Sequence, residues 1–221
     1  MIGIILCFVP LIFAFLIFAA GFKLKLTHLL IAVLLGLVAV LPISFIQYFM
    51  PALPGLPISA VVRALLKSLL LYGLVEEAIK TLALLPVPHK NESRLNFLLL
   101  AFTAGLSLGC FESVVYYFDH LQIANSRGAT LLYGQIAVRI FTSDIIHMCC
   151  TGLCGLFLFS CRNKPRHISC LITAVILHGV YDFFAGFSGN LRWFSVAVVL
   201  MAIAECRIKY ISLQNDENAT N

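Results

Sequence analysis

The amino-acid sequence predicts an all-α integral membrane protein, a polytopic bundle of about seven transmembrane helices. Three observations predict it: of the 221 residues, 61% are hydrophobic and 11% are charged, and the mean hydropathy is +1.00. A soluble globular domain carries about 25% charged residues. One span takes about 20 apolar residues, so this length leaves room for short loops but for no separate soluble domain. We therefore expect one membrane domain over residues 1–221, with a catalytic core over about 60–187.

Uninterrupted apolar stretches give the expected spans in order along the chain. They lie near residues 2–22, 27–50, 60–86, 95–118, 131–160, 168–187 and 191–206. The first stretch begins at Met1 without a basic leader or a small-residue cleavage site, so we expect a retained helix rather than a cleaved signal peptide. Pro10 and Pro42 predict kinks in the first two spans. The proline-rich run 50–57 predicts a loop.

Basic residues are distributed unequally over the two alternating sets of loops. One set carries Lys23, Lys25, Lys90, Arg94, Arg162, Lys164, Arg166, Arg207 and Lys209. The opposite set carries Arg63, Arg127 and Arg192. Because cytoplasmic loops are the richer in Lys and Arg, we expect the N-terminus outside and the polar tail 207–221 in the cytoplasm. The same rule accounts for the net charge of +5, so we expect the lipid bilayer and no nucleic acid as a partner.

Ionisable side chains occur inside four consecutive expected spans, the third to the sixth. They are Glu76, Glu77, Lys80, Glu112, Arg139, Asp144, His147, His178 and Asp182. A charge at the centre of a bilayer costs about 3 kcal/mol on insertion scales, so each is a candidate functional residue. A rise of about 1.5 Å per residue puts Glu76 and His178 about 15 Å from the expected cytoplasmic ends of their helices, and Glu112 about 25 Å. With helix tilt, these side chains can meet in one layer.

Two of the expected spans contain charge pairs at helical spacing. Lys80 follows Glu76 by four residues and Glu77 by three, so it can neutralise one glutamate and leave the other available as a base. The alternative is an ion pair that only packs the helix. Arg139 and Asp144 fit an internal charge pair of structural character.

Histidine and carboxylate spacings add a second group of candidates. His178 and Asp182 lie at i and i+4, so the aspartate can accept from one ring nitrogen and orient the other toward a site. Glu112 and Tyr116 share the same spacing and can form a supporting hydrogen bond. His147 stands alone, and a lone intramembrane histidine often only links helices.

The combination of these motifs is more specific than any one of them. In order, the chain carries Glu76-Glu77-x-x-Lys80, Phe111-Glu112-Ser113-x-x-Tyr116, His147 and His178-Gly179-x-Tyr181-Asp182-Phe183. The set resembles the PrsW-type intramembrane proteases, within the wider superfamily of CAAX-prenyl endopeptidases (CPBP/Abi). The resemblance covers residues 60 to about 187. Ser113 and Leu108 stand where family members often have Asn and Phe, and these departures concern packing and polar support.

The resemblance implies a peptidase that cleaves a membrane protein within or near the bilayer. In bacterial relatives the substrate is an anti-sigma factor cut on its extracytoplasmic side, which implies a bacterial plasma membrane. Peptide hydrolysis needs a base for water, donors for the oxyanion and an acid for the leaving amine. Glu76 or Glu77 can serve as the base. His147 and His178 can orient groups or donate protons, with Asp182 as the partner of a histidine.

Two chemistries remain open for these residues, and the expected cofactor is either none or one zinc ion. His147, His178 and a carboxylate such as Glu112 are candidate zinc ligands that would leave a position for water. The spacing is not the HExxH pattern of soluble zinc proteases, so the ligands would come from different spans. On sequence grounds we favour metal-independent glutamate catalysis.

Two other function classes fit parts of the sequence. An ion- or proton-coupled transporter also places carboxylates and histidines in the membrane, but it predicts internal repeats. No pseudo-symmetric halves are visible in the sequence. A non-catalytic scaffold would bind other membrane helices through small residues, yet it does not require the full set of glutamates and histidines. We therefore expect a peptidase.

Overall fold

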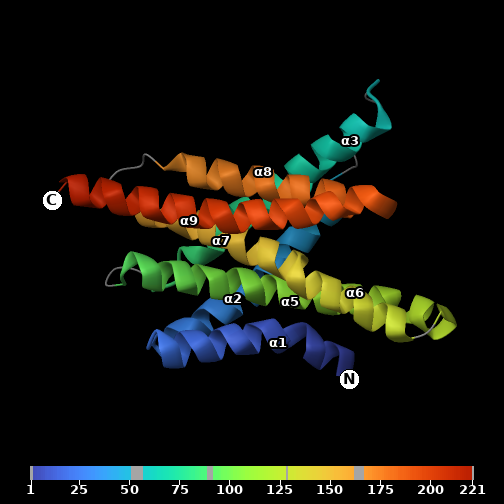
Figure 1. Ribbon diagram of the computed structural model, residues 1–221, viewed down its shortest axis with the longest axis horizontal. Helices are drawn as coiled ribbons and strands as arrows, with labels where there is room; N and C mark the ends of the chain where they lie inside the picture. Colours follow the sequence, from blue (N-terminus) through green and yellow to red (C-terminus); the bar gives the residue numbers. More distant parts are fainter. Residues whose placement is uncertain (1, 51–56, 89–91, 128, 162–166, 221) are drawn as a thin grey trace.

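The computed structural model describes residues 2–50, 57–88, 92–127, 129–161 and 167–220, which form seven helical rods (Figure 1). Four rods are single helices: α2 (Leu26–Phe49), α5 (Arg94–Arg127), α8 (Ile168–Ala185) and α9 (Phe194–Thr220), which the 3-10 turn η3 (Gly189–Trp193) precedes. The first rod joins α1 (Ile2–Leu16) to the π-helical η1 (Ile17–Gly21). The third rod joins α3 (Ala60–Lys67), the π-helical η2 (Ser68–Val75) and α4 (Glu76–Leu84), and the fifth joins α6 (Ala129–Phe141) and α7 (Ser143–Ser160). The all-helical class expected from the sequence is confirmed, and each expected apolar stretch falls on one rod.

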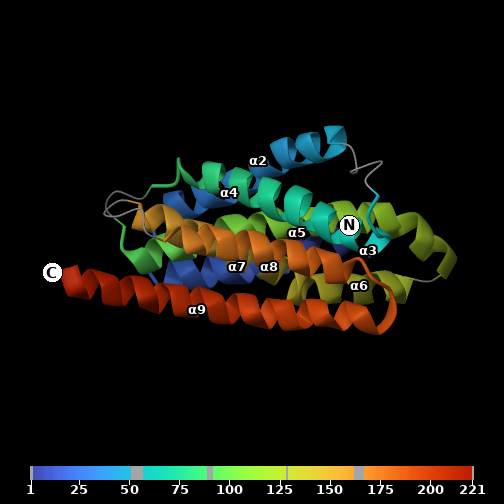
Figure 2. The ribbon, with the colours of Figure 1, turned by 90° about the horizontal axis from the view of Figure 1, so that it is seen from above.

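The rods run back and forth along the long axis of the bundle, so that α1 and α9 point in the same direction (Figures 1 and 2). α1 and α2 continue through Pro10 and Pro42. Residues 51–56 of the expected loop, and the basic residues Lys90, Arg162, Lys164 and Arg166, lie outside the described residues. The side chain of Arg127 also lies outside them.

Five of the described helical stretches are long and apolar enough to cross a membrane. They are Ile2–Gly21, Leu26–Phe49, Arg94–Leu121, Leu132–Ser160 and Ile168–Ala185. The two remaining rods carry more charge. The rod of α3 and α4 contains Arg63, Lys67, Glu76, Glu77 and Lys80, and α9 contains Glu205, Arg207, Lys209, Asp216 and Glu217. The chain is therefore a multi-pass membrane protein, and its first charged rod holds three of the candidate site residues, Glu76, Glu77 and Lys80.

Glycines allow the helices around that rod to approach closely. A Cβ atom on Gly73 of η2 would overlap the carbonyl oxygen of Val175, and one on Gly179 of α8 would lie 2.7 Å from the Leu69 Cα. A Cβ atom on Gly105 of α5 would overlap the carbonyl oxygen of His147 in α7. Small residues permit such backbone contacts between membrane helices. The contacts bring α8 beside η2 and α7 beside α5.

Two irregular helical segments border the polar centre of the bundle. The π-helical turn η2 ends at Val75, directly before Glu76. The rod of α6 and α7 is interrupted at Thr142, whose φ and ψ are −127° and −72°. Its hydroxyl donates to the Val138 carbonyl at 2.7 Å and accepts from the Tyr181 hydroxyl at 3.1 Å. π-helical turns often occur at functional sites, and both irregularities lie where the ionisable side chains gather.

Candidate functional site

The ionisable residues of four helices meet in the buried interior. Glu76, Glu77 and Lys80 come from α4, Glu112 from α5, His147 from α7, and His178 and Asp182 from α8. Apart from Glu112 and Asp182, these side chains are buried. The depth estimate from the sequence anticipates this meeting, because a regular rise per residue places equivalent positions of antiparallel helices at one level.

Glu77 is the fully engaged member of the glutamate pair. Its Oε1 accepts from Lys80 Nζ at 2.7 Å and lies 2.7 Å from His178 Nδ1. Its Oε2 accepts from the Cys154 thiol at 3.3 Å. The side chain has no solvent exposure. Glu77 is therefore the counter-charge of Lys80 and an orienting partner of His178.

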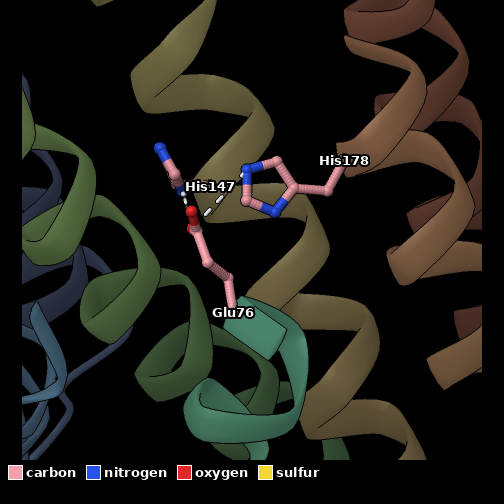
Figure 3. A group of neighbouring side chains, drawn as sticks. All are labelled: Glu76, His147 and His178. Carbon is pink, nitrogen blue, oxygen red and sulfur yellow. Dashed lines mark ion pairs between the residues drawn. The ribbon is translucent and has the colours of Figure 1, made fainter. Parts of the chain in front are cut away.

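Only one of the two carboxylate oxygens of Glu76 accepts a hydrogen bond from the described residues. Its Oε1 accepts a hydrogen bond from Gln47 Nε2 in α2 at 2.8 Å. Its buried Oε2 accepts no hydrogen bond from any described residue. Three basic atoms surround Oε2: Lys80 Nζ at 3.6 Å, His178 Nε2 at 3.7 Å and His147 Nδ1 at 4.0 Å. Figure 3 shows the carboxylate between the two imidazoles. An unsatisfied buried oxygen is costly, which points to a group that binds there.

Each imidazole has a carboxylate on the nitrogen that faces away from Glu76. His147 Nε2 lies 3.0 Å from Glu112 Oε2, and His178 Nδ1 lies 2.7 Å from Glu77 Oε1. Their other nitrogens, His147 Nδ1 and His178 Nε2, face Glu76. Metal-binding histidines commonly have this arrangement, because the second partner sets the tautomer and the ring orientation.

The donor set fits a divalent cation. One ligand atom each from Glu76, His147 and His178 lies within 4.8 Å of the others, and all three residues are buried. Two imidazoles and one carboxylate suit zinc. Within the described residues, the carboxylate of this group comes from Glu76, whereas the sequence suggested Glu112. Glu112 instead contacts Nε2 of His147, the nitrogen that faces away from Glu76. Lys80 Nζ lies 3.0 Å from His147 Nδ1, so a cation on that nitrogen would replace this hydrogen bond.

Asp182 contacts His178 as its spacing predicts, but on the other ring nitrogen, and Tyr116 contacts a residue other than Glu112. Asp182 Oδ2 lies 3.4 Å from His178 Nε2, the nitrogen that faces the glutamate group. Glu77, on Nδ1, has the orienting position that the sequence analysis gave to Asp182. The Tyr116 hydroxyl donates to Gln135 Oε1 at 3.4 Å. Asp182 thus borders the site, and Tyr116 contacts the neighbouring helix α6.

Arg139 has a partner that the sequence analysis did not expect, and Gln47 is a contributor that it missed. Arg139 Nη2 lies 3.4 Å from Glu112 Oε2, and its Nε donates to Ser113 Oγ at 3.0 Å. Ser113 Oγ donates in turn to Asp144 Oδ1 at 2.9 Å, so a hydroxyl links the expected charge pair. Gln47 is a polar residue within an apolar span, and that was the signal available in the sequence.

Two cavities border the polar centre. One has a volume of about 500 Å³ and is lined by Asp182 and Tyr181 of α8, by the end of α6 and by the start of α9. The other has a volume of about 280 Å³ and lies between α2 and α5. Glu112, Tyr116 and Arg139 line both. The two cavities therefore lie on two sides of Glu112 and Arg139, which contact the site.

The comparisons with known proteins point to one family. The PrsW-protease family model, described as PrsW family intramembrane metalloprotease, matches residues 25–205. The match extends the region of the motif resemblance, residues 60 to about 187, to α2 and to part of α9. No curated protein and no solved structure matches the chain.

Proposed function

The chain belongs to the PrsW family of intramembrane metalloproteases and is a peptidase, and we propose that it cleaves a peptide bond of a membrane protein at the group formed by Glu76, His147 and His178. One observation carries the proposal. The Glu76 oxygen that accepts no hydrogen bond from the described residues faces two imidazole nitrogens, and the opposite nitrogen of each imidazole lies against a carboxylate. This arrangement supports a metal-dependent site over the metal-independent chemistry that the sequence analysis favoured.

The roles of the ligand residues follow from their contacts. Glu76 Oε2, His147 Nδ1 and His178 Nε2 would hold the ion, and Glu77 and Glu112 fix the two imidazoles. A bound zinc ion would supply an open position for water and would polarise the peptide carbonyl. Without an ion, the free Glu76 oxygen would accept the proton of water as a general base.

Two residues at the edge of the large cavity are suited to proton transfer. Glu112 is 32% exposed and Asp182 is 27% exposed, and both line the cavity of about 500 Å³. Each lies beside one of the two histidines, so a proton taken from water can pass to the leaving amine without crossing apolar protein. The buried ammonium of Lys80 lies 3.6 Å from Glu76 Oε2 and can stabilise developing negative charge.

The substrate that we propose is a single membrane protein segment, such as that of an anti-sigma factor or a similar regulator. The larger cavity lies at the junction of α8, η3 and α9. The loop-charge bias puts this junction on the outer side of the membrane, and a cut there is extracytoplasmic. We propose a seven-span protein of the bacterial plasma membrane, placed in the CAAX-prenyl endopeptidase superfamily, with one membrane domain.

The proposed activity is tested on the purified full chain with detergent-solubilised membrane proteins of the source cells. New peptide termini are identified by mass spectrometry. We expect termini that are absent with a Glu76→Gln, Glu77→Gln double variant and absent after treatment with 1,10-phenanthroline, a chelator. The non-chelating isomer 1,7-phenanthroline is the control. Cleavage that survives the chelator, in protein without stoichiometric zinc, would exclude the metal-dependent form, and no cleavage under any condition would exclude the activity.

The proposed topology gives a second expected result. A cysteine-labelling tag at the C-terminus should be protected from a membrane-impermeant reagent in intact cells, and a tag at the N-terminus should react, because loops rich in Lys and Arg stay in the cytoplasm. Both tags should react after the cells are permeabilised. A C-terminal tag that reacts in intact cells is incompatible with the seven-span arrangement.

A further inference from the structure

Gln47 is the polar residue through which α2 reaches the site. Its Nε2 donates to Glu76 Oε1 at 2.8 Å and to the Leu71 carbonyl at 3.4 Å. Both neighbours are acceptors, so the amide group must present its NH₂ to them. Leu71 lies in the π-helical η2, and Glu76 is the residue that directly follows η2. The C-terminal part of this irregular turn and the start of α4 thus present two acceptors to one amide.

The hydrogen bond from Gln47 favours one orientation of the Glu76 carboxylate over a second one, a closer ion pair with Lys80. Lys80 Nζ is 2.7 Å from Glu77 Oε1 but 3.6 Å from Glu76 Oε2. A buried carboxylate beside an ammonium group gains most from a close ion pair. Without a donor on Oε1, Glu76 would have a buried oxygen to satisfy and would move toward Lys80. That movement would take its free oxygen away from the two histidines.

We propose that Gln47 is a positioning residue that holds the Glu76 carboxylate toward His147 and His178 and prevents a close ion pair with Lys80. This inference rests on the proposed function and adds α2 to the elements that build the site. Gln47 also lines the cavity of about 280 Å³ together with Glu112. Gln47 therefore contacts both Glu76 and the cavity that Glu112 borders.

The test measures Zn²⁺ affinity of the full-length protein in detergent, by competition with a chromophoric chelator. Gln47→Met keeps the length of the side chain and removes the donor. We expect Zn²⁺ binding weakened by about 10- to 100-fold, the usual effect of losing a partner of a metal ligand. In a Glu76→Gln background the same substitution should have no further effect, because Gln47 acts through Glu76. Tyr48 is next to Gln47 in the sequence and is 84% exposed, so Tyr48→Phe should bind Zn²⁺ like the parent.

Several outcomes separate this inference from the proposed function. A parent protein that binds no Zn²⁺ defeats the metal site itself. A parent that binds Zn²⁺, with equal affinity in Gln47→Met, defeats only the role of Gln47. An equal loss in both backgrounds would mean that Gln47 acts elsewhere, and it also defeats the inference. If Gln47→Met does not fold, Gln47→Asn retains the amide but shortens its reach, and the same outcomes apply to it.

Discussion

Replacing Glu76 with Gln is expected to lower the rate of peptide cleavage by about 100-fold or more while leaving the fold intact. The amide has nearly the volume of the carboxylate and can still accept from Gln47 through its oxygen. It has no negative charge, so it is a poor zinc ligand and no general base. The site would lose the carboxylate oxygen that lies between the two imidazoles and accepts no hydrogen bond from the described residues.

The measurement is the initial cleavage rate on the substrate identified by mass spectrometry, together with the zinc content of each protein. Glu205→Gln is the matched control, because Glu205 lies on α9 away from the group and should cleave at the parental rate. Size-exclusion profiles of both variants should match the parent. A Glu76→Gln protein that retains more than a tenth of the parental rate would remove Glu76 from the centre of the reaction.

Replacing Lys80 with Met is expected to have the largest effect on stability. Lys80 is 2% exposed and lies between Glu76 and Glu77. Its removal leaves adjacent carboxylates in the protein interior without a cation. Breaking a buried ion pair by removing one partner costs about 3–5 kcal/mol. The folded yield and the cleavage rate should both fall, and Lys80→Arg, which keeps the charge, should reduce the yield less.

Folded yield and the midpoint of thermal unfolding in detergent measure this effect. Lys67→Met is the control, because Lys67 lies on the same rod but is only half-buried and stands over the ring of Tyr72. A second substitution, Glu77→Gln, should restore part of the yield to Lys80→Met, since it removes the uncompensated charge. Normal yield together with full activity in Lys80→Met would show that the pair has no part in the site.

The helices and their order could be predicted from the sequence because hydrocarbon thickness sets the length of an apolar run. The seven expected stretches accordingly fall on the seven rods of the described residues. The irregular turns were not predicted. The π-helical η2 and the break at Thr142 have no proline in them, and they depend on contacts with α8, at Gly179 and Tyr181.

The sequence by itself determined the class of the protein, the family motifs and the set of ionisable side chains, since each is visible in residue type and spacing. Only the tertiary structure distinguished Glu76 from Glu77. Neighbouring helical residues point about 100° apart. Glu77 therefore contacts Lys80, Cys154 and the Nδ1 atom of His178, whereas Glu76 contacts Gln47 and faces the His147 Nδ1 and His178 Nε2 atoms. The tertiary structure also places Glu76, and not Glu112, with His147 and His178 in the group that could hold a metal ion. Partners such as Gln47, 29 residues before Glu76, come from other helices, and spacing within one helix cannot specify which side chains packing brings together.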